Sequence, residues 1–191
     1  MCIRDSLLVV AISGHGGQVI DPTGKEHLQF YFIPTTCDPN KHGEEERRKY
    51  CISEEEFSEL AKLGCRRLFI VDTCHSGAIG KHLVDTKAKL RAWRNENIAI
   101  WCATQPAQGA EEYLKFTKRL VEAIKGNADD NDDDYVTLKE TEAFIANRFK
   151  GQERIQKPQL YTIAPEFFTT DTPLLNLKLF RGSKSGSQAS D

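Results

Sequence analysis

Short apolar runs rich in β-branched side chains are the feature of this sequence that most constrains its fold. Two of them, residues 7–12 and 68–71, pass directly into turns that contain glycine. Runs of this length and composition predict strands that are buried on both faces, as in a parallel sheet. Helical patterns lie between the predicted strands. The sequence therefore predicts an α/β fold of three layers, with a mostly parallel sheet.

The remaining elements follow from periodicity and capping signals. We expect further strands over 28–33, 97–103 and 159–164 and an amphipathic helix through residues 116–124. Ser53 with Glu56, and Thr137 with Glu140, have the spacing of capping boxes, so each pair predicts the start of a helix. The polar segments 18–27, 35–52 and 78–96 are predicted to be loops.

Length and composition exclude several classes of protein. The chain has 191 residues, enough for one domain with a sizeable core. Its formal net charge of -2 argues against nucleic acid as the main partner. No stretch is long and apolar enough to span a membrane, and the N-terminus is a poor signal peptide.

The six cysteines are scattered along the chain, which suits a reducing compartment better than a disulfide framework. We therefore expect a cytoplasmic protein. Four of them lack the spacing of metal ligands and are expected to be inert; these are Cys37, Cys51, Cys65 and Cys102.

The chain divides into three parts. Residues 1–6 form a doubtful N-terminal boundary, because a core-like strand begins directly after them. Residues 7–180 are expected to form the folded domain. Residues 181–191 are rich in Ser and Gly and are expected to be a disordered tail or linker.

A histidine and a cysteine follow the two apolar runs described first. His15 stands in the turn after residues 7–12, and Cys74 stands in the turn after residues 68–71. In open α/β sheets, ligands bind at the carboxyl ends of the strands. A thiol becomes a good nucleophile when a nearby imidazole takes its proton, and that imidazole later protonates the leaving amine. The main-chain N–H groups of Gly16 and Cys74 are candidate donors to the developing oxyanion.

These turns resemble the motifs of a known family of peptidases. Residues 12–16, Ile-Ser-Gly-His-Gly, are similar to the histidine motif of clan CD cysteine peptidases. Residues 72–77, Asp-Thr-Cys-His-Ser-Gly, are similar to the cysteine motif of metacaspases and bacterial caspase-like proteins, or orthocaspases, in the peptidase C14 family. His15 lies 59 residues upstream of Cys74, and a caspase histidine stands about 50 residues before its cysteine. The resemblance covers most of residues 7–165.

The resemblance implies a caspase-hemoglobinase fold and cysteine endopeptidase activity without a cofactor or metal. It implies His15 as general base and Cys74 as nucleophile. Asp72 corresponds to the acid of the family's S1 pocket, which takes the side chain before the cleaved bond, and Ser13 corresponds to a serine that helps to shape that pocket. A carboxylate pairs with a basic side chain. The expected partners are therefore protein or peptide substrates cleaved after Arg or Lys.

The sequence departs from the family pattern in two respects. The strand and helix that begin the family's sheet are absent before residue 7, and a further acid of the S1 pocket usually lies there. Metacaspases that need calcium carry an Asp-rich cluster after the histidine motif, whereas residues 28–33 are apolar and aromatic here. That calcium site is therefore not expected.

Other interpretations of these residues stay open. His75 is adjacent to the nucleophile, and we expect a structural role for it. Asp72 has an alternative role as a hydrogen-bond acceptor for neighbouring N–H groups. The chain as a whole could instead be a non-catalytic caspase-like scaffold, an inactive fragment of a larger protein, or a transamidase that uses the same site.

Two charged segments also have two interpretations each. Residues 129–140 match several ligand positions of an EF-hand loop, but position 6 is Asp134 instead of Gly. We therefore favour a solvated acidic turn over a calcium site. The basic segment 78–96 is a solvated linker or, given a preference for Arg and Lys, a site of self-cleavage.

Overall fold

The computed structural model describes residues 7–20, 28–34, 37, 49–60, 63, 65–89, 98–105, 115–153, 156–163, 171 and 173–176. The expected tail, 181–191, and the boundary, 1–6, lie outside them. Among the described residues, no helix combines the length and the apolar character needed to cross a membrane.

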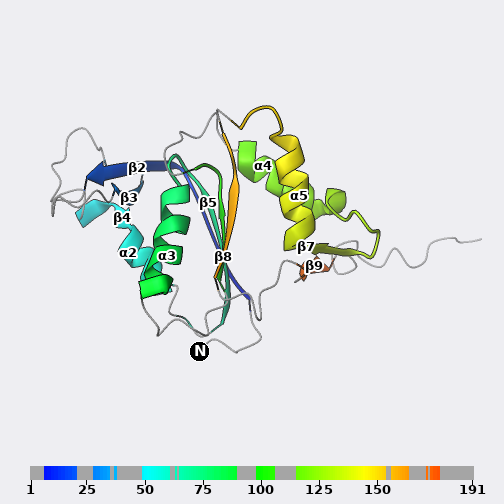
Figure 1. Cartoon of the computed structure of the whole chain (residues 1–191), viewed down its shortest axis with the longest axis horizontal. Helices are drawn as coiled ribbons and strands as arrows, with labels where there is room; N and C mark the ends of the chain where they lie inside the picture. The colour runs from blue at the N-terminus through cyan, green and yellow to red at the C-terminus, as the bar shows by residue number, and fades with distance from the viewer. Residues whose placement is uncertain are drawn as a thin grey trace, which may run out of the picture.

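A four-stranded sheet forms the centre of the molecule (Figure 1). Its order is β1 (Leu7–Ser13), β5 (Arg66–Asp72), β6 (Ile98–Cys102) and β8 (Gln159–Ile163). The first three strands are parallel, and β8 runs antiparallel to β6. The prediction of a mostly parallel sheet in an α/β fold is therefore confirmed.

Helices cover both faces of this sheet and complete the three layers (Figure 1). On one face lie α2 (Glu54–Leu60) and α3 (Gly77–Lys89). On the other face lie α4 (Lys115–Glu122), its continuation η2 (Ala123–Asn127) and α5 (Leu138–Arg148).

β6 is buried along its whole length, and the apolar middle of β5 packs on both faces of the sheet. On β5, Phe69 and Val71 belong to the core cluster with Ile79 and Leu83 of α3. Leu68, on the opposite face of β5, belongs to a second cluster with residues of α4 and α5. Alternate side chains of one strand thus enter two separate cores.

The capping boxes are present as predicted. The Ser53 main-chain N–H donates to Glu56 Oε2 at 2.7 Å, and the Glu56 N–H donates to Ser53 Oγ at 3.4 Å. The same reciprocal pair joins Thr137 and Glu140 at the start of α5. Each pair satisfies two N–H groups that a helix start would otherwise leave without partners.

The loop prediction for residues 78–96 is wrong over residues 78–89, which belong to α3. Ile79 and Leu83 lie four residues apart, about one helical turn, and both side chains are buried. Packing of this apolar pair against the sheet outweighs the helix-breaking glycines and the basic residues. Residues 90–97 lie outside the described residues.

A second sheet stands at the end of the central one and carries the histidine motif. It consists of β2 (His15–Ile20), β3 (Leu28–Ile33) and the short β4 (Ile52–Ser53), all antiparallel. In Figure 1, β2 extends sideways from the central sheet. The loop prediction for 18–27 is wrong over residues 18–20, because pairing with β3 makes them part of β2. A small third sheet joins β7 (Tyr135–Thr137) to β9 (Pro173–Asn176).

Candidate active site

The turns that carry the histidine and the cysteine leave the central sheet side by side. β1 and β5 are adjacent and parallel, with Ser13 opposite Asp72 in the register. The Gly14 N–H donates to the Asp72 carbonyl at 3.2 Å, one residue beyond that pairing. The two motifs therefore leave the central sheet from neighbouring strands at the same edge.

Gly16 brings the histidine motif into direct contact with the cysteine turn. A Cβ atom on Gly16 would overlap the Cys74 carbonyl oxygen and would lie 2.7 Å from Thr73 Oγ1 and 2.8 Å from the Phe30 ring. Only a residue without a side chain fits there. His15 is the residue before this contact, and its side chain is exposed to solvent.

Cys74 lies in a short turn between β5 and α3, with its side chain partly exposed. The Thr73 hydroxyl donates to the Cys74 carbonyl at 3.1 Å. His75 has a φ of 58°, in the left-handed region that non-glycine residues rarely adopt. The backbone therefore turns sharply at His75, directly after Cys74, instead of continuing as a strand.

Two buried hydroxyls hold this turn against the end of β6. Thr104 Oγ1 accepts a hydrogen bond from the Ser76 N–H at 3.1 Å and donates to the Thr73 carbonyl at 3.3 Å. The Ser76 hydroxyl accepts from the Thr104 N–H at 3.1 Å. Ser76 and Thr104 are both fully buried. Neither residue was predicted to belong to the site, although Thr104 follows a predicted strand at the same edge of the sheet.

Asp72 is buried, with 7% of its surface exposed, and has a partner on α4. Its Oδ2 accepts hydrogen bonds from the Thr117 N–H at 3.1 Å and from the Thr117 hydroxyl at 2.5 Å. A carboxylate at this position satisfies an N–H group in the first turn of α4. This agrees with the alternative interpretation of Asp72 as an acceptor for neighbouring N–H groups. Ser13 lies beside Asp72 on β1, and its side chain is exposed.

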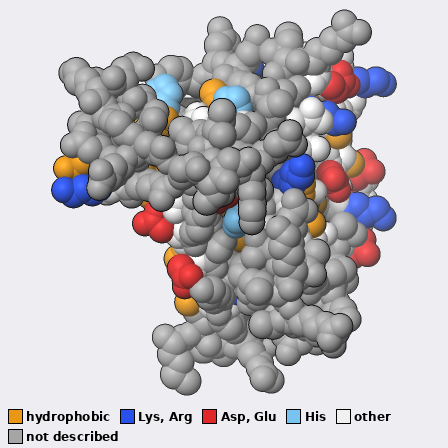
Figure 2. All heavy atoms as spheres, turned by 60° about the vertical axis from the view of Figure 1, so that its left-hand side comes forward, with side chains coloured by type: hydrophobic (Ala, Val, Ile, Leu, Met, Phe, Trp, Pro, Cys, Tyr) orange, Lys and Arg blue, Asp and Glu red, His pale blue; other side chains and the backbone are white. Residues whose placement is uncertain are grey.

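Histidine side chains reach the surface on the face shown in Figure 2. Of the described histidines, His15 is exposed, and His75 and His82 are partly exposed. His82 Nδ1 lies 3.0 Å from a carboxylate oxygen of Glu54, which is buried and also accepts from the Phe30 N–H at 3.2 Å. His82 is therefore part of the packing between α2, α3 and β3.

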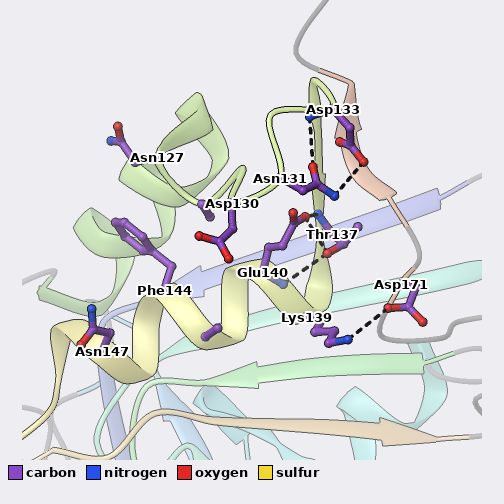
Figure 3. A pocket seen from close by; sticks show the side chains of 12 residues that line it. Asn127, Asp130, Asn131, Asp133, Thr137, Lys139, Glu140, Phe144, Asn147 and Asp171 are labelled. Carbon is purple, nitrogen blue, oxygen red and sulfur yellow. Dashed lines mark hydrogen bonds and ion pairs between the residues drawn. The ribbon is translucent and has the colours of Figure 1, made fainter.

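A separate cavity of about 650 Å³ lies beside α5, away from the histidine and cysteine turns (Figure 3). Its walls include the acidic loop, residues 129–134, and the start of α5 with Thr137 and Glu140. They also include the exposed pair of Lys139 and Asp171, whose charged atoms are 3.9 Å apart.

The acidic loop itself is tightly turned by its own side chains. Asp129 accepts from the N–H groups of Asp133 and Asp134, at 3.2 and 3.1 Å, and Asp133 accepts from the Tyr135 N–H at 2.8 Å. Asp134, at position 6 of the EF-hand pattern, has a φ of 68°. The objection that this position needs glycine is therefore weaker than the sequence suggested, because aspartate tolerates this conformation.

The Glu140 carboxylate is held in the capping box with Thr137. Within the described residues, no three side chains of His, Cys, Asp or Glu gather as a metal-binding group.

Comparison with known proteins extends the description of the fold. No family model matches the chain, and no curated protein does so either. Among solved structures, the chain is similar to the crystal structure of protein GSU0716 from Geobacter sulfurreducens, with a TM-score of 0.54 and 17% sequence identity. The match covers 83% of this chain and 66% of that chain, so the present chain spans slightly less than two thirds of its neighbour's length. At this identity, the similarity concerns the fold alone.

Proposed function

We propose that this chain is a cysteine endopeptidase in which His15 is the general base and Cys74 the nucleophile. The observation that supports the proposal most directly is the contact between Gly16 and the Cys74 carbonyl, because it holds the two motifs together at the carboxyl edge of the sheet. The resemblance of both motifs to those of metacaspases and orthocaspases adds independent support.

In the proposed reaction, His15 takes the proton of the Cys74 thiol, and the sulfur attacks the carbonyl carbon of the scissile peptide bond. The main-chain N–H groups of Gly16 and Cys74 stabilise the oxyanion that forms. The imidazolium then protonates the leaving amine, and the carbon–nitrogen bond breaks. Water hydrolyses the remaining thioester and restores the thiol.

Substrate preference in this proposal depends on Asp72, with Ser13 beside it. A buried carboxylate at the edge of the site favours a basic side chain before the cleaved bond. The proposed substrates are therefore proteins or peptides cleaved after Arg or Lys, and the proposed compartment is the reducing cytoplasm. The hydrogen bonds from Thr117 go to Oδ2 of Asp72. The other carboxylate oxygen, Oδ1, then pairs with the basic side chain of the substrate.

A panel of fluorogenic peptides with Arg, Lys or Asp before the cleaved bond tests the proposal. We expect turnover of the Arg and Lys peptides and its loss in Cys74→Ala. His15→Asn should also abolish turnover. His75→Asn is the matched control, since asparagine tolerates the positive φ of that position.

Two kinds of result would contradict the proposal. A variant series in which His75→Asn abolishes turnover and His15→Asn does not would reassign the base. Absence of turnover of all three peptides would favour the non-catalytic scaffold, and preference for the Asp peptide would exclude the role given to Asp72.

A further inference from the structure

Cys37 and Cys51 are in direct contact, although they lie 14 residues apart in the sequence. Their sulfur atoms are 3.1 Å apart, and both side chains are buried, with 6% and 4% of their surfaces exposed. Neither sulfur is in a disulfide bond. A disulfide bond is about 2 Å long, so the two sulfurs need to approach by only about 1 Å to form one.

The backbone around both cysteines is anchored to the same pair of strands. The Cys37 N–H donates to the Pro34 carbonyl at 2.9 Å, and Pro34 follows β3 directly. Cys51 immediately precedes β4, in which Ile52 pairs with Phe32 of β3. Both thiols are therefore held at one end of the β3–β4 pair, and a bond between them would close the connection between these strands.

The contact also adjoins β3, which pairs with β2, the strand that carries His15. Cys37 and Cys51 form a small buried cluster with Tyr31, and Ile33 packs against it. In the pairing of β2 with β3, Ile33 lies opposite His15. A change at the two thiols would therefore take place beside β3, the strand that pairs with His15.

We propose that Cys37 and Cys51 form a reversible redox site that exchanges with low-molecular-weight disulfides such as glutathione disulfide. One cysteine thiolate attacks a sulfur of the external disulfide, giving a mixed disulfide and releasing one thiol. The second cysteine thiolate attacks the protein sulfur of the mixed disulfide and releases the second thiol. The two cysteines lose two protons and two electrons, and the external disulfide gains both.

Burial of the two sulfurs gives the site its expected behaviour. The first attack needs local opening around the pair, because neither sulfur is accessible in the closed state. The second attack is intramolecular and needs little movement, so the mixed disulfide should not accumulate. Proteolytic activity is not needed for either step, and the proposal stands whether or not the chain is a peptidase.

Peptide mapping tests the redox site. The experiment uses the Cys74→Ala chain, which lacks the most exposed of the described thiols. The chain is incubated with glutathione disulfide, quenched with acid, alkylated with N-ethylmaleimide in denaturant and digested with trypsin. Lys41 and Lys49 lie between the two cysteines, so trypsin separates them onto different peptides. We expect these peptides to remain linked after oxidation, to separate on reduction, and to be linked equally in the unaltered chain.

Alkylation of both cysteines in the oxidised sample would overturn the proposal. Stable glutathione adducts on either of them, or a bond from either to another cysteine, would do the same.

Matched variants give a second readout. Oxidation should raise the melting temperature of the unaltered chain and of Cys65→Ser, which removes another buried thiol, but not that of Cys51→Ser. An equal rise in Cys51→Ser would contradict the proposal. If Cys51→Ser does not fold, the peptide map of the unaltered chain decides the question.

Discussion

Gly16 faces the main-chain carbonyl oxygen of Cys74 so closely that a Cβ atom would overlap it. This contact joins β2, in the second sheet, to the turn that follows β5. It makes the histidine and cysteine motifs one structural unit, although His15 lies in the second sheet and Cys74 follows a strand of the central one.

Substitution of Gly16 by alanine should therefore separate the two motifs. We expect Gly16→Ala to lower the free energy of unfolding by about 1–3 kcal/mol, as overpacking does in a closed site, and to abolish any peptidase turnover. Urea unfolding and the peptide panel measure the two effects. Gly17→Ala is the matched control, because its Cβ would meet only the end of the Ile33 side chain, at 3.3 Å. Equal losses in both variants would contradict the importance of the contact with Cys74.

Thr104 should stabilise the cysteine turn through its hydroxyl. Thr104→Val keeps the shape of the side chain but leaves the Ser76 N–H and the Thr73 carbonyl without this partner. We expect a loss of about 1–3 kcal/mol, the cost of burying unsatisfied polar groups. A double-mutant cycle with Ser76→Ala measures the coupling between the two hydroxyls. We expect the stability losses of the single variants not to add up in the double variant. Strict additivity would show that the two hydroxyls act independently.

Asp72 and Thr117 can be separated by their effects on substrate preference. Asp72→Asn should reduce turnover of the Arg peptide by about 10- to 100-fold, the value of one or two charge-assisted hydrogen bonds, if Asp72 contacts the substrate. Thr117→Val removes only a hydroxyl donor to Asp72 and should lower stability without changing the preference among Arg, Lys and Asp peptides. Parallel losses of stability and turnover in both variants, with preference unchanged, would show that Asp72 acts only through α4.

Stability should fall at alkaline pH because of one buried and one half-buried group. Burial raises the pKa of the Cys102 thiol from 9.0 to about 12, although a main-chain hydrogen bond with Gly80 acts in the opposite direction. Burial, and then the charge of Cys102, raises the pKa of Tyr161 from 10.0 to about 12. Between about pH 9 and 12 the unfolded chain loses these protons first, so the free energy of unfolding decreases as the pH rises.

Urea unfolding at several pH values above 8 measures this effect. The slope of stability against pH should be shallower in Cys102→Ala than in the unaltered chain. The comparison uses slopes, since the variant also loses some stability through the smaller side chain. Identical slopes would rule out a contribution from Cys102.

Self-cleavage, if it occurs, should avoid residues 77–89. The helix α3 would have to unwind before a bond after Lys81 could enter an active site, because peptidases bind their substrates in extended form. Intact masses of the unaltered chain and of Cys74→Ala, measured over time, should show any specific cut outside this range. A cut after Lys81 that depends on Cys74 would contradict the expectation.

The sequence by itself determined the elements whose signals are local. The apolar runs predicted β1 and β5, and the pairs Ser53–Glu56 and Thr137–Glu140 predicted two helix starts, because capping and periodicity depend on residues close together in the chain. Since the carboxyl ends of parallel strands meet at one edge of a sheet, the position of each motif directly after a strand also predicted that His15 and Cys74 lie at that edge.

Only the tertiary structure decided which distant groups meet. It made residues 78–89 a helix, because Ile79 and Leu83 pack against the sheet. It directed Asp72 toward Thr117, and it placed the sulfurs of Cys37 and Cys51 in contact. These contacts depend on how separate elements pack against one another, and no local pattern of residues records that packing.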